Sequence, residues 1–206
     1  WPTFAGHFCG NYFWYFLLTW LPYYLVRARH LSLRTMAVVA PLALLATAAA
    51  TVCAGWISSR ALAAGATPTR VRKTCTVLGL TLATSVVAVP VVHGTRAAIA
   101  LLVFSGLAYG VFASSHWVIT QTIAGPLAAG RWSGMQNFAA NLAGVVAPAL
   151  TGFVVQRTGA FFWAFAAVGA VALAGAGAYL FGLGAVEPAG WKCAASGDAP
   201  GLTPGA

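Results

Sequence analysis

Long apolar stretches, separated by short basic segments, dominate the pattern of this 206-residue sequence. Six windows contain no Asp, Glu, Lys or Arg, namely 1–26, 35–59, 74–95, 97–130, 132–156 and 158–186. Each window exceeds the roughly 20 apolar residues that a helix needs to cross the hydrocarbon core of a membrane. The pattern therefore predicts six transmembrane helices, at about 4–26, 36–58, 74–93, 97–122, 133–156 and 160–184.

The windows favour helices over strands. Strands of a membrane barrel are about ten residues of alternating polarity, whereas runs such as 41–50 and 168–178 are continuously apolar and rich in Ala. Charged residues make up 6% of the chain and hydrophobic ones 60%. A water-soluble domain carries about 25% charged residues, so the composition excludes that class. The predicted fold class is an all-α membrane protein.

The net charge of +9 comes from basic residues between the windows. Lys and Arg concentrate at membrane ends and in cytoplasmic loops, so the charge indicates a lipid bilayer and no nucleic-acid partner. The densest basic cluster lies in the 60–73 connection, which we assign to the cytoplasm. Alternating spans then place both termini in the cytoplasm. The Pro- and Gly-rich segment 187–206 cannot bury a core, and we expect a disordered cytoplasmic tail there.

Residues suited to catalysis or metal binding are sparse. The four cysteines show no CxxC spacing, and His7-x-Cys9 is an isolated pair. Neither a disulfide framework nor a metal or other cofactor is predicted. Ser105-Gly106 and Ser133-Gly134 come nearest to a Gly-x-Ser-x-Gly nucleophile, but no triad pattern accompanies them. An intramembrane enzyme is therefore a disfavoured alternative, and we predict no enzymatic activity.

Side-chain amides occur in the first, fourth and fifth windows only. Because an amide that faces lipid is costly, these three helices should each turn one face toward protein or water. Helical spacing groups the polar, small and kinking residues into three stripes: Asn11, Tyr15, Thr19 and Pro22; Gly110, Ser114, Trp117 and Gln121; and Ser133, Asn137, Asn141, Gly144 and Pro148. Three such helices would enclose a polar, aromatic-walled cavity whose amides bind hydroxyls and carboxylates.

Helix packing is the alternative role for the same residues. Amides form hydrogen bonds across membrane helices, and small residues let helices approach; Gly106-x-x-x-Gly110 and Gly130-x-x-x-Gly134 have that spacing. Packing explains any single residue slightly better, whereas a cavity explains the three stripes together. For His116, packing is the simpler role and ion coupling the alternative. No carboxylate precedes Glu187, although proton-coupled mechanisms usually keep one within the membrane.

The stripes lie in segments that resemble the anion:cation symporter family of the major facilitator superfamily. Residues 11–25 resemble its seventh helix, and 125–148 are similar to its tenth and eleventh helices. The connection between the second and third windows resembles the cytoplasmic loop motif between helices eight and nine. That motif is carried here by Gly55, Ser59, Arg60, Gly65, Arg72 and Lys73, with Ser59 in place of the usual Asp. The resemblance covers about residues 4–185.

The resemblance implies the C-terminal six-helix half of a twelve-helix transporter in a bacterial cytoplasmic (inner) membrane. Such proteins move sugar acids and other small organic anions by alternating access, usually in symport with protons. The resemblance also implies substrate-facing positions for Ser114, Trp117 and Asn137, and it places Asn11 and Tyr15 in a cavity-lining helix. The polar stripes and the imidazole add Gln121, Asn141 and His116 as further candidates. The arginine for the substrate carboxylate and the acidic proton sites would belong to the missing N-terminal half.

Two hypotheses remain for the whole protein: the chain is part of a longer sequence, or it stands alone. Its first residue is Trp1 and not Met, so we expect a piece of a longer chain or a trimmed one. A stand-alone six-helix membrane protein that associates with itself to complete a pore is the other hypothesis.

Overall fold

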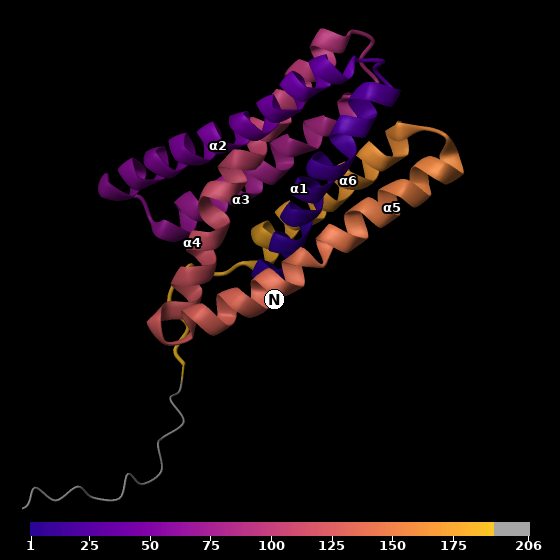
Figure 1. The fold of residues 1–206 in the computed structure, drawn as a ribbon. Helices are drawn as coiled ribbons and strands as arrows, with labels where there is room; N and C mark the ends of the chain where they lie inside the picture. The colour runs from indigo at the N-terminus through magenta and orange to yellow at the C-terminus, as the bar shows by residue number, and fades with distance from the viewer. Residues whose placement is uncertain (192–206) are drawn as a thin grey trace, which may run out of the picture.

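The computed structural model describes residues 1–191, and every regular element within them is a helix, in agreement with the all-α prediction (Figure 1). The α-helices are α1 (Pro2–Arg27), α2 (Leu33–Ala63), α3 (Pro68–Ala83), α4 (Thr95–Asn141), α5 (Ala143–Thr158) and α6 (Phe161–Gly177). A 3-10 helix, η1 (Thr84–Ala88), extends α3, and a π-helical segment, η2 (Ala178–Gly182), extends α6.

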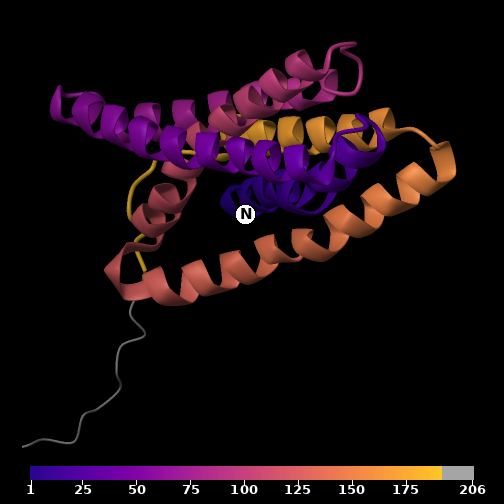
Figure 2. The same cartoon turned by 45° about the horizontal axis from the view of Figure 1, so that its top comes forward.

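Helix α4 contains a sharp break. The sequence predicts one span to end near residue 122 and the next to begin near 133, yet the structure is helical between them except at Gly125, whose φ of 61° and ψ of 176° are non-helical. Pro126 follows, and proline fits the first position of a helix because the N–H it lacks would have no partner there. We call residues 95–124 and 126–141 the first and second arms of α4. Figure 2 shows the second arm continuing into α5 as one long, bent rod.

Several helical runs are long and apolar enough to cross a membrane. In the described residues these are Leu33–Ala63, Pro68–Ala88, Thr95–Thr158 and Phe161–Gly182. The 64-residue run Thr95–Thr158 is about three times the length of one crossing, and the break at Gly125 divides it. Helix α1 is 26 residues long but less apolar, because it carries Asn11, His7 and several tyrosines. The chain is an integral membrane protein.

The first arm of α4 packs closely on α2 through two small residues. A Cβ atom on Gly106 would lie 2.4 Å from Ala43 O, and one on Gly110 would lie 2.4 Å from Thr47 O. The Thr47 hydroxyl donates to Gly106 O at 2.9 Å. The predicted role of Gly106-x-x-x-Gly110 in helix packing is therefore confirmed.

The spacing Gly130-x-x-x-Gly134, by contrast, faces no other helix within the described residues. A Cβ atom on either glycine would meet no atom within 4 Å. Both glycines lie on the second arm of α4, shortly after the break at Gly125. The spacing alone does not show whether a second helix lies opposite it.

The connections gather at two ends of the bundle. At one end Arg29, which follows α1, donates to Val92 O at 2.8 Å and to the Tyr24 hydroxyl at 2.7 Å. At the other end Lys73 Nζ donates to Leu183 O at 2.8 Å. The basic connection between α2 and α3 therefore lies at the same end as the segment that follows η2.

The first residues of the predicted tail, 187–206, pack beside the break in α4. Ala189 N donates to Ile123 O at 2.8 Å, and Trp191 Nε1 donates to Ala124 O at 2.7 Å. The Trp191 ring also lies 5.5 Å from that of Trp132. The rest of the predicted tail lies outside the described residues.

Candidate functional site

A pocket of about 420 Å³ opens between α1, α2 and both arms of α4. Its volume lies within the range of small-molecule sites, about 300–1,000 Å³. Four helical segments contribute to its wall: α1 gives His7, Asn11, Trp14 and Tyr15; α2 gives Thr47 and Thr51; the first arm of α4 gives Tyr109, Ala113, His116 and Trp117; and the second arm gives Asn137 and Asn141. Among these described lining residues none is Lys, Arg, Asp or Glu.

Helical spacing explains why these side chains meet. On α1 the contributing residues follow at intervals of four, seven and eight from His7, and on the second arm of α4 they are four apart. Such intervals place side chains on one face of a helix. The break at Gly125 then lets the second arm turn that face toward α1.

A chain of hydrogen bonds runs along the pocket wall from α1 to the second arm of α4. The Tyr15 hydroxyl donates to Asn141 Oδ1 at 2.6 Å. Asn141 Nδ2 in turn donates to Asn137 O at 2.8 Å and to Asn137 Oδ1 at 2.9 Å. Because Asn141 uses its donors within the protein while Asn137 takes part as acceptor, the amide N–H donors of Asn137 can serve a ligand.

A second, buried network lies beside the pocket and centres on Gln136. Its side chain is 0% exposed, and its Nε2 donates to Thr120 Oγ1 at 2.8 Å and lies 3.3 Å from His7 Nδ1. Trp132 Nε1 donates to Gln136 Oε1 at 3.2 Å. The Gln136 side chain thus connects α1 with both arms of α4, near the break at Gly125.

The two imidazoles of the pocket pack against each other and against aromatic rings. The ring centroids of His7 and His116 are 4.7 Å apart, and those of His7 and Trp117 are 4.8 Å apart. His116 also stacks on Phe112 at 4.8 Å, and its Nδ1 lies 3.1 Å from Ala113 O. These contacts fit the packing role that the sequence favours for His116.

The pocket includes six of the eight predicted site residues. They are Asn11, Tyr15, His116, Trp117, Asn137 and Asn141. Ser114 and Gln121 do not line it. The Ser114 hydroxyl donates to the carbonyl of Val111 at 2.7 Å, whereas Gln121 is exposed and lines a separate depression beside Gly125.

Sequence reasoning missed six lining residues: His7, Trp14, Thr47, Thr51, Tyr109 and Ala113. The amide criterion excluded α2, which contributes only hydroxyl groups. The spacing of Thr47 and Thr51, one helical turn apart, was the available signal. Their hydroxyls donate to Gly106 O and Gly110 O at 2.9 and 3.2 Å, so they both line the pocket and connect two helices.

The residues of the predicted loop motif make mostly local contacts. The Ser59 hydroxyl donates to Gly55 O at 3.0 Å, and Arg60 Cζ lies 4.4 Å from the centroid of the Trp56 ring. Gly65 has a φ of 93°, a conformation that glycine adopts readily in turns. Lys73 alone reaches a distant segment, at Leu183 O.

A helical membrane bundle with a polar pocket beside a broken helix has features of a secondary transporter. The chain belongs to the Major Facilitator Superfamily, whose family model matches residues 1–148. Members of this family, and the relatives described next, are transporters and not enzymes.

Three relatives illustrate the similarity. In Bacillus subtilis (strain 168), the "Probable galactarate/D-glucarate transporter GudP" is 31% identical over 187 residues, covering 90% of this chain and 40% of the relative. The "Hexuronate transporter" of the same strain is 31% identical over 174 residues, covering 83% and 41%. The "Probable galactarate/D-glucarate transporter GarP" of Escherichia coli (strain K12) is 30% identical over 187 residues, covering 88% and 42%. The chain thus spans about 40% of the length of these relatives.

Proposed function

We propose that this chain is the C-terminal six-helix half of a twelve-helix transporter for sugar acids, which works by alternating access. The six spans would be α1, α2, α3 with η1, the first arm of α4, its second arm with α5, and α6 with η2. Two observations support a half: the chain spans about 40% of the relatives' length, and no charged residue is among the described residues that line the pocket. The relatives named for galactarate, D-glucarate and hexuronates support the substrate class.

Within the pocket, we assign substrate contacts to the amides of Asn11 and Asn137 and to the rings of Tyr15 and Trp117. Amides donate to carboxylates and both donate to and accept from hydroxyls. Aromatic rings pack on the apolar C–H faces of a sugar acid and add a polar edge. The Tyr15–Asn141–Asn137 chain of hydrogen bonds is the observation that carries the proposal, because it fixes the polar wall across two helices.

The charge of the substrate requires a contribution from elsewhere. A dicarboxylate is doubly negative, yet no Lys or Arg is among the described residues that line the pocket. A carboxylate placed in a water-excluded site without a counter-charge would be strongly destabilised. We therefore assign the cation that pairs with the substrate, and the acidic groups for proton symport, to the N-terminal half.

Uptake into proteoliposomes tests the function. The chain is joined to its N-terminal half, reconstituted, and supplied with radiolabelled galactarate, D-glucarate or D-glucuronate. We expect saturable uptake that is stimulated when the outside is acidic and lost when a protonophore is added. Absence of uptake for all three sugar acids would contradict the substrate class, and uptake indifferent to the pH gradient would contradict proton symport.

The orientation of the bundle is part of the same proposal. The basic connection around Arg70 and Lys73 faces the cytoplasm, as does the segment after η2, because Lys73 joins the two at Leu183. A single cysteine placed at Thr67, in a background without native cysteines, should react with a membrane-impermeant maleimide in inside-out vesicles and not in right-side-out ones. The reverse labelling pattern would invert the orientation.

A further inference from the structure

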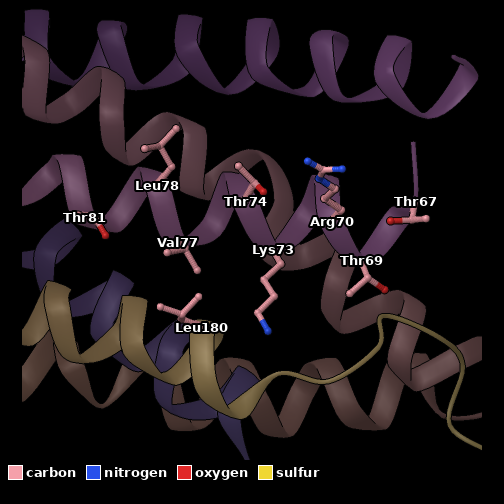
Figure 3. A pocket seen from close by; sticks show the side chains of 9 residues that line it. All are labelled: Thr67, Thr69, Arg70, Lys73, Thr74, Val77, Leu78, Thr81 and Leu180. Atoms are coloured by element: carbon pink, nitrogen blue, oxygen red, sulfur yellow. The ribbon is translucent and has the colours of Figure 1, made fainter. Parts of the chain in front are cut away.

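A second hollow lies along α3, away from the substrate pocket. It encloses about 590 Å³, and its lining includes Arg70 and Lys73 at one end and Val77, Leu78 and Leu180 further along, with threonines between them (Figure 3). No residue is shared between its lining and that of the substrate pocket. The groove is therefore a site distinct from the substrate pocket.

Two neighbouring rows of side chains on α3 form the groove. One row is Arg70, Thr74 and Leu78, and the other is Lys73, Val77 and Thr81. Residues four apart lie one above the other on a helix, so each row begins with a cation and continues with uncharged side chains. In Figure 3 Lys73 and Val77 lie on the side of α3 that faces Leu180 of η2. The groove is thus basic at one end, and along the rest of its length it is uncharged and lined by aliphatic and threonine side chains.

The length of the groove matches one leaflet of a bilayer. At a rise of 1.5 Å per residue, the eight steps from Lys73 to Thr81 span about 12 Å. Half of a hydrocarbon core of about 30 Å is about 15 Å. The basic end lies beside Leu183 and Val186, where the chain leaves the helices. The cations therefore lie at the level of lipid head groups, and the apolar part lies at the level of acyl chains.

The basic end is available to an anion. Arg70 is exposed, and Lys73 gives one of its three N–H donors to Leu183 O. Glu187 is the only acid in residues 1–191, and it is not among the lining residues of the groove. Basic pockets at the cytoplasmic ends of membrane helices attract anionic head groups.

We propose that this groove binds an anionic phospholipid, with the phosphate at Arg70 and Lys73 and one acyl chain along Val77, Leu78 and Leu180. Leu78 and Leu180 are 47% and 45% exposed, so an acyl chain would cover apolar surface that a soluble phosphate ester leaves uncovered. The two cations favour an anionic lipid over a zwitterionic one. The apolar side chains of the groove favour a lipid over a free head group.

Native mass spectrometry of the detergent-solubilised protein tests the site. The protein is titrated with dioleoyl phosphatidylglycerol, and with dioleoyl phosphatidylcholine as the zwitterionic lipid of equal chains. We expect tighter binding of phosphatidylglycerol and about thirtyfold weaker binding in Arg70→Gln/Lys73→Gln, from the contribution of two cations near a membrane surface. The matched control Arg60→Gln/Arg72→Gln removes the same charge from side chains that do not line the groove, and it should weaken binding much less.

Equal weakening by the two double variants would overturn the proposal, because it would show diffuse attraction to the whole basic connection. Unchanged binding in Arg70→Gln/Lys73→Gln would do the same. If that variant cannot be extracted in a folded state, Arg70→Gln alone changes an exposed side chain and should weaken binding about fivefold, with Arg60→Gln as its control. No change beyond that of Arg60→Gln would also refute the site.

Two further measurements separate a lipid from a soluble anion. Leu78→Trp enlarges a side chain that lines the groove and is 47% exposed, so it should weaken phosphatidylglycerol binding while the melting temperature of the lipid-free protein stays near that of the wild type. Glycerophosphoglycerol, which is the head group without chains, should not displace the bound lipid. Displacement by glycerophosphoglycerol at comparable concentrations would show a phosphate-ester site and not a lipid groove.

Discussion

At the scale of a single residue, a substitution at Asn137 distinguishes a ligand-binding role from a structural one. Its side chain is exposed and lines the pocket. Asn137→Ala should raise the apparent KM for sugar-acid uptake about fivefold to tenfold, as expected for the loss of about one hydrogen bond, with little change in melting temperature. Gln121→Ala, an amide on the same helix outside the pocket, is the control and should change neither quantity. An unchanged KM together with a lower melting temperature would assign Asn137 to helix packing.

Gln136 is expected to behave in the opposite way. It is fully buried, and its amide bonds to Thr120 and Trp132. Gln136→Leu should lower stability by about 1–3 kcal/mol, because it leaves buried partners without a hydrogen bond. Thermal unfolding in detergent measures this, with the exposed Gln121→Leu as the matched control. Equal melting temperatures for the two variants would show that the network contributes nothing to stability.

Residue types could be predicted from the sequence more readily than the direction of each side chain. Helical spacing of amides and polar aromatic residues placed Asn11, Tyr15 and Asn137 on polar stripes, and all three line the pocket. Ser114 does not line the pocket, whereas its neighbour Ala113 does, and adjacent helical residues point about 100° apart. An apolar alanine gives no polar signal, so its place on the pocket wall could not be predicted from the sequence.

At the scale of elements, the contact between α2 and α4 depends on two glycines. Gly106→Ala would bring a Cβ atom within 2.4 Å of the Ala43 carbonyl oxygen, and backbone cannot move aside cheaply. We expect a loss of about 1–3 kcal/mol, typical of overpacking. Gly134→Ala is the control, because nothing lies within 4 Å of its added Cβ, and it should leave the melting temperature unchanged or raise it. A stable Gly106→Ala protein would show that α2 and α4 are not held at this separation.

The break in α4 gives a second prediction at this scale. Gly125 combines a φ of 61° with a ψ of 176°, a region that is essentially restricted to glycine and costs other residues about 1–3 kcal/mol. Gly125→Ala should therefore destabilise the protein and displace the second arm, which also moves Asn137 and Asn141 relative to α1. Raised KM and lower melting temperature together are the expected result. Wild-type values for both would argue against a fixed break.

The elements themselves followed largely from the spacing of charges, since a buried charge in lipid is costly and marks a helix end. The connection between the fourth and fifth predicted spans was the exception. The predicted spans end near residue 122 and resume near 133, but between them only Gly125 departs from helical geometry. Composition reports where a helix can stop, whereas tertiary packing decides whether it does. The packing of Trp191 and Ala189 beside this break likewise had no signal in the local sequence.

The whole molecule exposes apolar surface where a second bundle or lipid must lie. Phe138 and Val145, on the second arm of α4 and on α5, are each 72% exposed. The neutral pocket lies beside them and lacks a counter-charge for an anion. Both features are explained together if another helical bundle covers this side and brings the missing charges. A membrane protein of this family would then be complete only as two halves around one pocket.

Counterflow in liposomes tests this claim most directly. Liposomes loaded with unlabelled D-glucarate are prepared with the 206-residue chain alone, and with the chain joined to its N-terminal half. The account predicts accumulation of labelled D-glucarate only when both halves are present, and less accumulation when Asn137→Ala is introduced. Counterflow of D-glucarate by the chain alone would contradict it.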